Sequence, residues 1–316
     1  MSARRLFARA AVALVLALLV AAPFVLGQFE AGLLAEMMVW GILAMGLDLI
    51  FGYTGMLSFG QALFFGLGAY GMALSFLHLK LPFFPALAVA ILLAGLAACV
   101  TGVFAVRLTW HYFAIITIIF SLVVYFFAVG RSDLTGGDDG LSFQIPALLS
   151  LGGVDVSVYE PAVEYYFILV MLALSYLLLR RITGSQLGLV FRAVRDNPER
   201  ASLLGYHTLR YRWIAFVIAG LICGLSGALF ATKSRYASAS FLFWTVSGDA
   251  VIWTVVGGAG TLVGPLIGTA LLIGVRDYLS KWFEHYLLLV GGIAIGIVLV
   301  APQGIMGILR GRGPRA

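Results

Sequence analysis

The sequence predicts an all-α, polytopic integral membrane protein with about nine or ten transmembrane or partly spanning helices. Of its 316 residues, 62% are hydrophobic and 11% are charged, against roughly 45–50% and about 25% in soluble domains. Lipid is therefore the expected solvent, and apolar runs long enough for a membrane helix of ~20 residues recur along the chain. We expect one transmembrane domain over residues 1–316, with membrane segments at 10–27, 33–51, 55–77, 82–106, 112–130, 162–179, 213–232, 248–275 and 286–301.

Two polar stretches of opposite charge interrupt these segments. Residues 131–164 hold six carboxylates and Arg131 as the single base, whereas residues 180–212 hold seven arginines against Asp196 and Glu199. Because cytoplasmic loops carry an excess of basic residues, we expect the basic loop, about 180–212, inside the cell and the acidic loop, about 131–161, outside. Counting spans from a cytoplasmic N-terminus gives the same arrangement.

Two segments allow more than one interpretation. The basic start followed by the apolar run to Leu26 is compatible with a secretory signal, but the cleavage pattern near Val20 is poor, which favours an uncleaved first helix. The region 248–275 is long for one helix and is broken by glycines in its middle. We favour two short helices there, because this version returns the basic C-terminus to the cytoplasmic side.

Glycines gather in two clusters, one beginning at Gly52 and the other at Gly257. Fourfold spacing in each cluster (Ser58, Ala62 and Gly66; Gly260, Gly264 and Gly268) would place small residues on one helix face, which is typical of close helix packing. The alternative is that glycine-interrupted segments, one in each half of the chain, line a transport pathway. Both interpretations remain open on sequence alone.

Five stretches carry recognisable motifs, in order along nearly the whole chain. They are Gly52-Tyr53-Thr54-Gly55-Met56-Leu57-Ser58-Phe59-Gly60-Gln61 continuing to Tyr70, Tyr112–Thr117, Thr135-Gly136-Gly137-Asp138-Asp139-Gly140-Leu141, the Arg192–Gly205 loop, and Gly257–Pro265. Together these stretches resemble the permeases of branched-chain amino-acid ABC transporters. The length of the chain and the Thr-Gly-Gly-Asp element resemble the second of the two paired permease subunits.

The resemblance implies a transporter subunit rather than an enzyme, with no cofactor bound by this chain. No Gly-x-x-x-x-Gly-Lys-[Ser/Thr] occurs, so ATP would be used by a separate cytoplasmic subunit. The other implied partners are a second homologous permease, a periplasmic substrate-binding protein and membrane lipid. A location in the cell inner membrane is also implied, and no basic, aromatic stripe predicts nucleic-acid binding.

Within the basic loop, Glu199-Arg200-Ala201 followed by Gly205 resembles the Glu-Ala-Ala-x-x-x-Gly element that docks ABC importers on their ATPase. Arg200 replaces the usual first alanine, and the closing Leu-Pro is missing. An ordinary basic loop is the plain alternative. The residues expected to couple to the ATPase are Arg195, Asn197, Glu199, Arg200, Ala201 and Gly205.

Ionisable residues inside spans are costly and often functional. Asp48 could bind a substrate ammonium, pair with a cation of the partner permease, or lie near the cytoplasmic interface. Ser58 and Gln61 suit weak binding of a zwitterion, and amides of the Thr135 element could hold a carboxylate, although Asp138 would oppose one. The expected pathway residues are Asp48, Tyr53, Gly55, Ser58, Gln61, Thr135, Gly136, Gly137, Gly257, Gly258 and Gly260.

Several functions stay open at this stage. Urea, short amides or aromatic acids are carried by similar permeases, and Asp48 and Asp249 would also suit a stand-alone ion-coupled carrier or channel. No metal site is expected, because the four histidines lack ligand spacing. Cys99 and Cys223 lie in apolar runs, where packing is their expected role.

Overall fold

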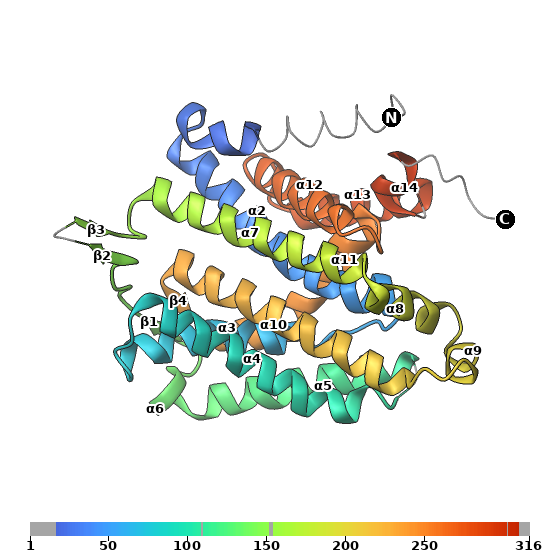
Figure 1. Ribbon diagram of the computed structural model, residues 1–316. Coiled ribbons are helices and arrows are strands. Elements are labelled where there is room, and N and C mark those ends of the chain that lie inside the picture. Colours follow the sequence, from blue (N-terminus) through green and yellow to red (C-terminus); the bar gives the residue numbers. More distant parts are fainter. Residues whose placement is uncertain (1–16, 109, 152–153, 302, 310–316) are drawn as a thin grey trace.

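The chain forms an elongated bundle of helices with two small sheets at one end (Figure 1). The computed structural model describes residues 17–108, 110–151, 154–301 and 303–309. The α-helices are α2 (Gln28–Asp48), α3 (Gln61–Leu77), α4 (Phe83–Ala105), α5 (Trp110–Gly130), α6 (Ser132–Thr135), α7 (Pro161–Thr183), α8 (Gln186–Asp196), α9 (Pro198–Leu203), α10 (Thr208–Ser234), α11 (Trp244–Gly257), α12 (Val263–Ser280), α13 (Tyr286–Val300) and α14 (Gly304–Leu309). A π-helix, η1 (Leu49–Tyr53), continues α2, and a 3-10 helix, η2 (Ala239–Leu242), precedes α11.

The prediction of a polytopic all-α membrane protein is confirmed. In the described part of the chain, six helices are long and apolar enough to cross a membrane, and α3 is a shorter apolar helix. The first predicted segment, 10–27, is helical over residues 17–25, and its residues 10–16 lie outside the described part. The six spans are Gln28–Tyr53, Phe83–Ala105, His111–Gly130, Pro161–Gly184, Thr208–Ser234 and Tyr286–Gly307.

The two polar stretches lie at opposite ends of the bundle (Figure 1). We call the end that carries α8 and α9 the basic end, and the end that carries α6 and the strands the acidic end. At the acidic end, β1 (Leu141–Ser142) pairs antiparallel with β4 (Tyr236–Ala237), and β2 (Leu149–Leu151) pairs antiparallel with β3 (Val154–Val156). The β1–β4 pair joins the acidic loop to the end of α10.

The region 248–275 is broken, as favoured above. α11 ends at Gly257, α12 begins at Val263, and the two helices form an antiparallel hairpin. Close approach explains the glycines, because a Cβ on Gly257 would overlap the Gly264 carbonyl and one on Gly268 would overlap the Trp253 carbonyl. The apex of this hairpin, residues 258–262, lies at the basic end (Figure 1).

The expected helix over 55–77 is wrong at its start, because α3 begins only at Gln61. Gly55 adopts a φ of +75°, which glycine tolerates and a helix does not. Ser58 therefore lies outside the helix that carries Ala62 and Gly66. Gly260, with a φ of +78°, likewise lies in the hairpin apex, so neither fourfold row forms a single helix face.

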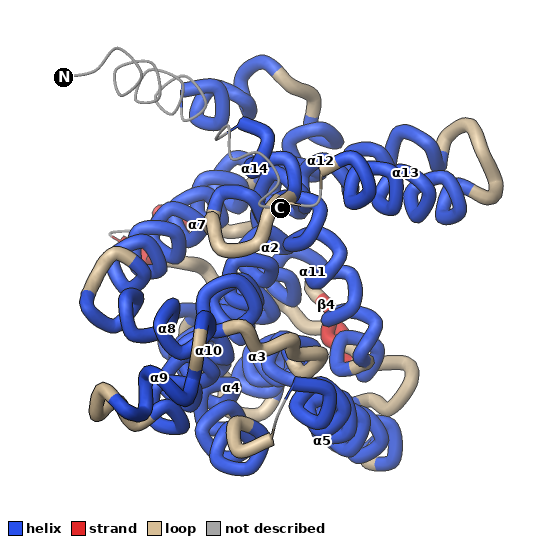
Figure 2. The backbone as a smooth tube through the Cα atoms, turned by 90° about the vertical axis from the view of Figure 1, so that its right-hand side faces the viewer, coloured by secondary structure: helices blue, strands red, loops and turns tan. Residues whose placement is uncertain are grey.

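The core forms where α10 packs between α2, α3 and α4, as the view from the basic end shows (Figure 2). Small residues bring the backbones together: a Cβ on Gly68 would overlap the backbone of Gly224, and one on Gly227 would overlap the Phe65 carbonyl. Ser226 of α10 also donates a hydrogen bond of 2.7 Å to the Val39 carbonyl of α2. In a membrane, burying an apolar side chain against another helix gains little over leaving it against lipid tails. Membrane helices therefore associate through close packing of this kind.

This packing predicts a sharp difference between two glycines. Gly227→Ala would force α10 and α3 apart, so we expect a clear loss of folded, monodisperse protein in detergent and a lower melting temperature. Gly296→Ala in α13 is the matched control, because its Cβ would meet no atom within 4 Å and alanine favours a helix over glycine. Equal behaviour of the two variants in fluorescence-detected gel filtration would contradict this account of the core.

Candidate functional site

The two glycine clusters meet at Asp48, the last residue of α2. Its side chain is fully buried. One carboxylate oxygen accepts a hydrogen bond of 2.6 Å from the Gly260 amide, and the other accepts one of 3.0 Å from the Leu262 amide. Asp48 therefore fastens the apex of the α11–α12 hairpin to the end of α2. Of the three roles left open for Asp48, a position near the basic end fits this geometry, and both carboxylate oxygens are already engaged.

The backbone around Asp48 is shaped by this contact. A Cβ on Gly52 would overlap both the Asp48 carboxylate and the Gly260 amide nitrogen. Leu262 adopts a φ of +58°, which is rare for a residue with a side chain, and its amide is the one that binds Asp48. The site thus combines a π-helix, a strained leucine and a buried carboxylate, and both π-helices and backbone strain concentrate at functional sites.

Arg195 brings the basic loop into the same junction. It extends from the end of α8 and donates a hydrogen bond to the Gly52 carbonyl. The stem of this side chain runs so close to Gly55 that a Cβ there would lie 3.0 Å from Arg195 Cγ. The sequence predicts that Arg195, Glu199 and Arg200 all couple to the ATPase. All three residues are exposed, but Arg195 also reaches back to the Gly52 carbonyl of its own chain.

Helix α9 is held in place by local contacts. The Asn197 side chain accepts a hydrogen bond of 2.9 Å from the Arg200 amide and caps the helix. Ala201 is buried against Val190 and Val194 of α8, which explains why a small residue stands there. Gly205 ends the helix with a φ of +88° and has no atom within 4 Å of where a Cβ would stand.

An apolar surface surrounds α9 at the basic end. Leu203 and Leu204 are 88% and 75% exposed, although they lie in the polar loop. Beside them, a cavity of about 550 Å³ opens between α8 and the start of α10. Two neighbouring leucines this exposed are unusual in a polar loop. The cavity is lined by Gln186, Leu187, Leu189, Val190, Ala193, Tyr206 and Tyr211.

The start of α3 places Ser58 and Gln61 inside the bundle. The Ser58 hydroxyl accepts a hydrogen bond of 3.2 Å from the Gly60 amide, and the Ala62 amide donates one of 2.7 Å to the Ser247 hydroxyl. Gln61 is fully buried, and neither atom of its side-chain amide has a partner among the described residues. An unpaired buried amide destabilises a folded protein by about 1–3 kcal/mol, so Gln61 lowers the free energy of unfolding. Tyr53 lies buried nearby in the chain.

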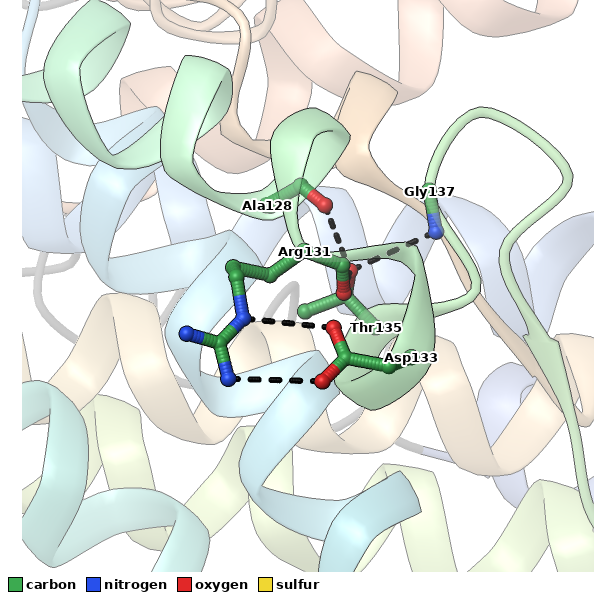
Figure 3. A network of polar contacts seen from close by, with 5 residues as sticks. All are labelled: Ala128, Arg131, Asp133, Thr135 and Gly137. Carbon is green, nitrogen blue, oxygen red and sulfur yellow. Dashed lines mark hydrogen bonds and ion pairs between the residues drawn. The ribbon is translucent and has the colours of Figure 1, made fainter.

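The Thr135 element forms a tight turn at the acidic end (Figure 3). The Thr135 hydroxyl donates to the carbonyls of Ala128 and Arg131 and accepts from the Gly137 amide at 3.3 Å. The Gly136 amide donates to the Ser132 carbonyl at 3.0 Å. Both glycine amides are thus engaged within the loop, so they do not form the carboxylate site considered above.

The left-handed backbone of Gly136 and Gly137 explains their presence, because their φ angles are +72° and +60°. Arg131 and Asp133 form an exposed ion pair beside the turn (Figure 3). A hydrogen bond from the Arg131 guanidinium holds the pKa of the Asp133 carboxyl below its ordinary value.

One group of ionisable residues was missed from sequence. Glu36 of α2 lies with Lys233 and Arg276 near the acidic end. An ionisable residue inside a predicted membrane span is a sign of function, and Glu36 falls inside the predicted 33–51 span. Among the described residues, no three His, Cys, Asp or Glu side chains are placed to hold a metal ion.

The Asp48 contact leads to a stability prediction. Asp48→Ala would leave two buried amides without acceptors, each at a cost of about 1–3 kcal/mol, partly offset by removal of a buried carboxylate. We expect a lower melting temperature of the solubilised protein, with Asp48→Asn in between because it keeps one acceptor. Asp139→Asn, exposed at the acidic end, is the control; an unchanged melting temperature for Asp48→Ala would contradict the clamp.

Comparison with known proteins identifies relatives of this chain among transport permeases. The chain is 28% identical over 315 residues to the high-affinity branched-chain amino acid transport system permease protein LivM of Escherichia coli, covering 93% of this chain and 74% of the relative. It is 27% identical to the probable permease protein LivH of Methanocaldococcus jannaschii (46% of this chain, 48% of that one) and 31% identical to the fructose import permease protein FrcC of Rhizobium meliloti (36% and 33%).

No solved structure matches the chain. The sequence profile of the family described as "Branched-chain amino acid transport system / permease component" matches residues 30–301. That range runs from the start of α2 to the end of α13 and includes both glycine clusters, the basic loop and the acidic loop. This chain therefore belongs to the branched-chain amino acid transport permease family.

Proposed function

We propose that the chain is the transmembrane permease subunit of an ABC importer for branched-chain amino acids. A separate ATP-binding subunit would drive it from the cytoplasm, and a periplasmic binding protein would deliver the solute. A second, homologous permease would complete the pathway; the relatives include two differently named permease proteins, LivM and LivH, of high-affinity branched-chain amino acid transport systems. The subunit would lie in the inner membrane with its N-terminus in the cytoplasm, as the basic loop favours.

The observation that carries this proposal is the Arg195 contact. It joins the basic loop directly to the glycine-rich break after α2. A force applied to α9 by an ATPase would pass through α8 to Arg195 and from there to the Gly52 carbonyl. Because Asp48 ties the same place to the apex of the α11–α12 hairpin, two discontinuous membrane segments would move together. Gly55, Gly257, Gly258 and Gly260 give this junction the backbone freedom that such movement needs.

The docking surface for the ATPase would be α9 and the apolar surface around it. Leu203 and Leu204 would enter a groove of the partner, while exposed Glu199 and Arg200 would pair at its rim. Asn197 and Ala201 would serve indirectly, by capping α9 and packing it on α8. At the acidic end, exposed Asp138 and Asp139 would face the binding protein.

The proposed pathway would pass near Gln61, whose fully buried side-chain amide has no partner among the described residues and would bind a polar solute when the bundle opens. Branched-chain amino acids are favoured as cargo by the names of the relatives. Urea, amides or aromatic acids would need only a different binding protein. A stand-alone ion-coupled carrier is less favoured, because both oxygens of Asp48, one of the two aspartates that support it, are bound to backbone amides.

Affinity purification of the tagged chain from native membranes tests the assembly. We expect it to recover an ATP-binding subunit and a second permease, and uptake of leucine by the reconstituted complex to require ATP. A homo-oligomer whose transport survives ATP depletion would refute the proposal.

Arg195→Met tests the coupling contact. It removes the hydrogen bond to Gly52 but leaves α9 intact, so we expect ATP hydrolysis to continue while uptake falls about tenfold or more. The matched control is Arg210→Met, an exposed arginine at the start of α10, which should keep both activities. If Arg195→Met loses ATP hydrolysis and uptake in parallel, Arg195 does not transmit movement from α9 to the Gly52 carbonyl.

Gly205 separates bulk from backbone strain. Gly205→Ala carries the strain of a side chain at a φ of +88° but adds almost no bulk, and it should retain uptake. Gly205→Trp meets no atom of this chain within 4 Å of its Cβ but would protrude from the α9 surface, so we expect uptake to fail while the binding protein still captures its substrate. Normal uptake in Gly205→Trp would remove α9 from the proposed ATPase interface.

A further inference from the structure

A charged cavity opens between the first half of α2 and the ends of α10 and α12. These parts of the helices lie toward the acidic end of the bundle (Figure 1). The volume of the cavity is about 540 Å³, within the range of roughly 300–1,000 Å³ that is usual for small-molecule sites. It lies toward the opposite end of α2 from the Asp48 junction. The residues that matter to its chemistry are Phe29, Leu33, Glu36, Lys233, Arg276 and Asp277.

Glu36 lies between two cations but leaves hydrogen-bond donors on both of them unused. Its carboxylate oxygens lie 3.7 Å from Lys233 Nζ and 3.6 Å from Arg276 Nη2, distances too long for good hydrogen bonds. The described residues offer neither cation a closer acceptor. Both therefore keep N–H donors that can bind a second anion in the cavity.

An ordinary surface ion pair explains this cluster poorly. Such pairs stabilise a protein by only about 0–1 kcal/mol, whereas ionisable side chains within membrane segments are costly. Glu36 stands eight residues into α2, about 12 Å from its start at the helical rise. Lys233 and Glu36 are only 22% and 26% exposed, whereas Arg276 is 45% exposed, so the cluster is partly withdrawn from solvent around an open cavity.

Aromatic side chains form the floor below Glu36. Trp40 donates a hydrogen bond of 3.4 Å to the Glu36 carboxylate. The Trp40 ring stacks on Phe65 at 4.9 Å and packs against Phe230 at 4.8 Å and Trp253 at 5.5 Å between ring centroids. This cluster packs next to Glu36 among the helices of the bundle, while Phe29 and Leu33 add apolar surface to the lining of the cavity.

We propose that this cavity binds a zwitterionic amino acid with an apolar side chain. Lys233 and Arg276 bind its carboxylate, Glu36 binds its ammonium, and its side chain packs against Phe29 and Leu33. Asp277 takes no direct part, because it is already paired with Lys281 at 2.9 Å. The charges of the cavity match both ends of a zwitterion, whereas Glu36 would repel a simple anion held by the same two cations. The proposal rests on the proposed function, because it takes the transported solute as the ligand and makes this cavity the loading site at the acidic end.

The test measures ligand-dependent thermal stability of the assembled transporter in phosphatidylcholine nanodiscs without the binding protein. The probes are L-leucine, 4-methylpentanoate, which lacks the amine, and 3-methylbutylamine, which lacks the carboxylate. We expect leucine to stabilise the wild type more than either analogue. Arg276→Gln should raise the half-saturating concentrations of leucine and 4-methylpentanoate about tenfold or more, the usual effect of losing a charged hydrogen bond.

Glu36→Gln supplies an independent readout. It removes the charge that binds the ammonium and frees both cations, so leucine should lose its advantage over 4-methylpentanoate. Arg131→Gln is the matched control, because it removes one positive charge from an exposed pair at the same end. It should leave all three titrations unchanged.

Titration curves of Arg276→Gln that overlay the wild type would overturn the proposal. It would also fall if leucine has no effect while phosphatidylglycerol nanodiscs stabilise the wild type but not Arg276→Gln, since the cavity would then hold a lipid phosphate. Failure of the proposed function looks different. Leucine would still stabilise the wild type and not Arg276→Gln, but the complex would show no ATP-dependent leucine uptake.

Discussion

The fold at the basic end depends on one buried carboxylate. Burying a charge is costly unless hydrogen bonds compensate it, and Asp48 receives two from the backbone at Gly260 and Leu262. These bonds fix the apex of a broken hairpin against the π-helix that ends α2. The same contact leaves no room for a side chain at Gly52 and presents the Gly52 carbonyl to Arg195. Two membrane segments and the basic loop therefore share a single point of attachment.

The sequence predicts the membrane segments well, because hydropathy depends on composition alone. The predicted 82–106 and 162–179 runs correspond to α4 and α7 at Phe83–Ala105 and Pro161–Thr183. The start of α3 was not predictable in this way, because distant partners determine it. Ser247 binds the Ala62 amide and Thr117 binds the Phe59 amide, and these contacts hold residues 55–60 out of a helix. A local pattern carries no information about such partners.

The candidate site shows the same limit. Its residue types were recognisable, since an aspartate and clustered glycines in apolar segments are unusual. That Asp48 would bind residues more than 200 positions away could not be read from spacing, nor could the inward direction of Arg195. Lys233 lies in the last turn of α10, where a cation is expected, and Arg276 lies one turn before the end of α12. Only the fold shows that they converge on Glu36 around a cavity.

Helix α2 gives a physical reason to connect the two ends of the bundle. It carries Glu36 in its first half, Trp40 in the aromatic floor and Asp48 at its end, within one continuous helix of 21 residues. Helix α2 continues directly into the π-helix η1, and Asp48 ties the point where they meet to the hairpin apex. A shift of the basic loop that pulls on Gly52 would reach α2 at this point and would displace Trp40 together with Glu36, to which Trp40 donates a hydrogen bond. The junction at Asp48 and the loading cavity at Glu36 would then change together in one movement of α2. No chain of small side-chain shifts between the two sites is needed.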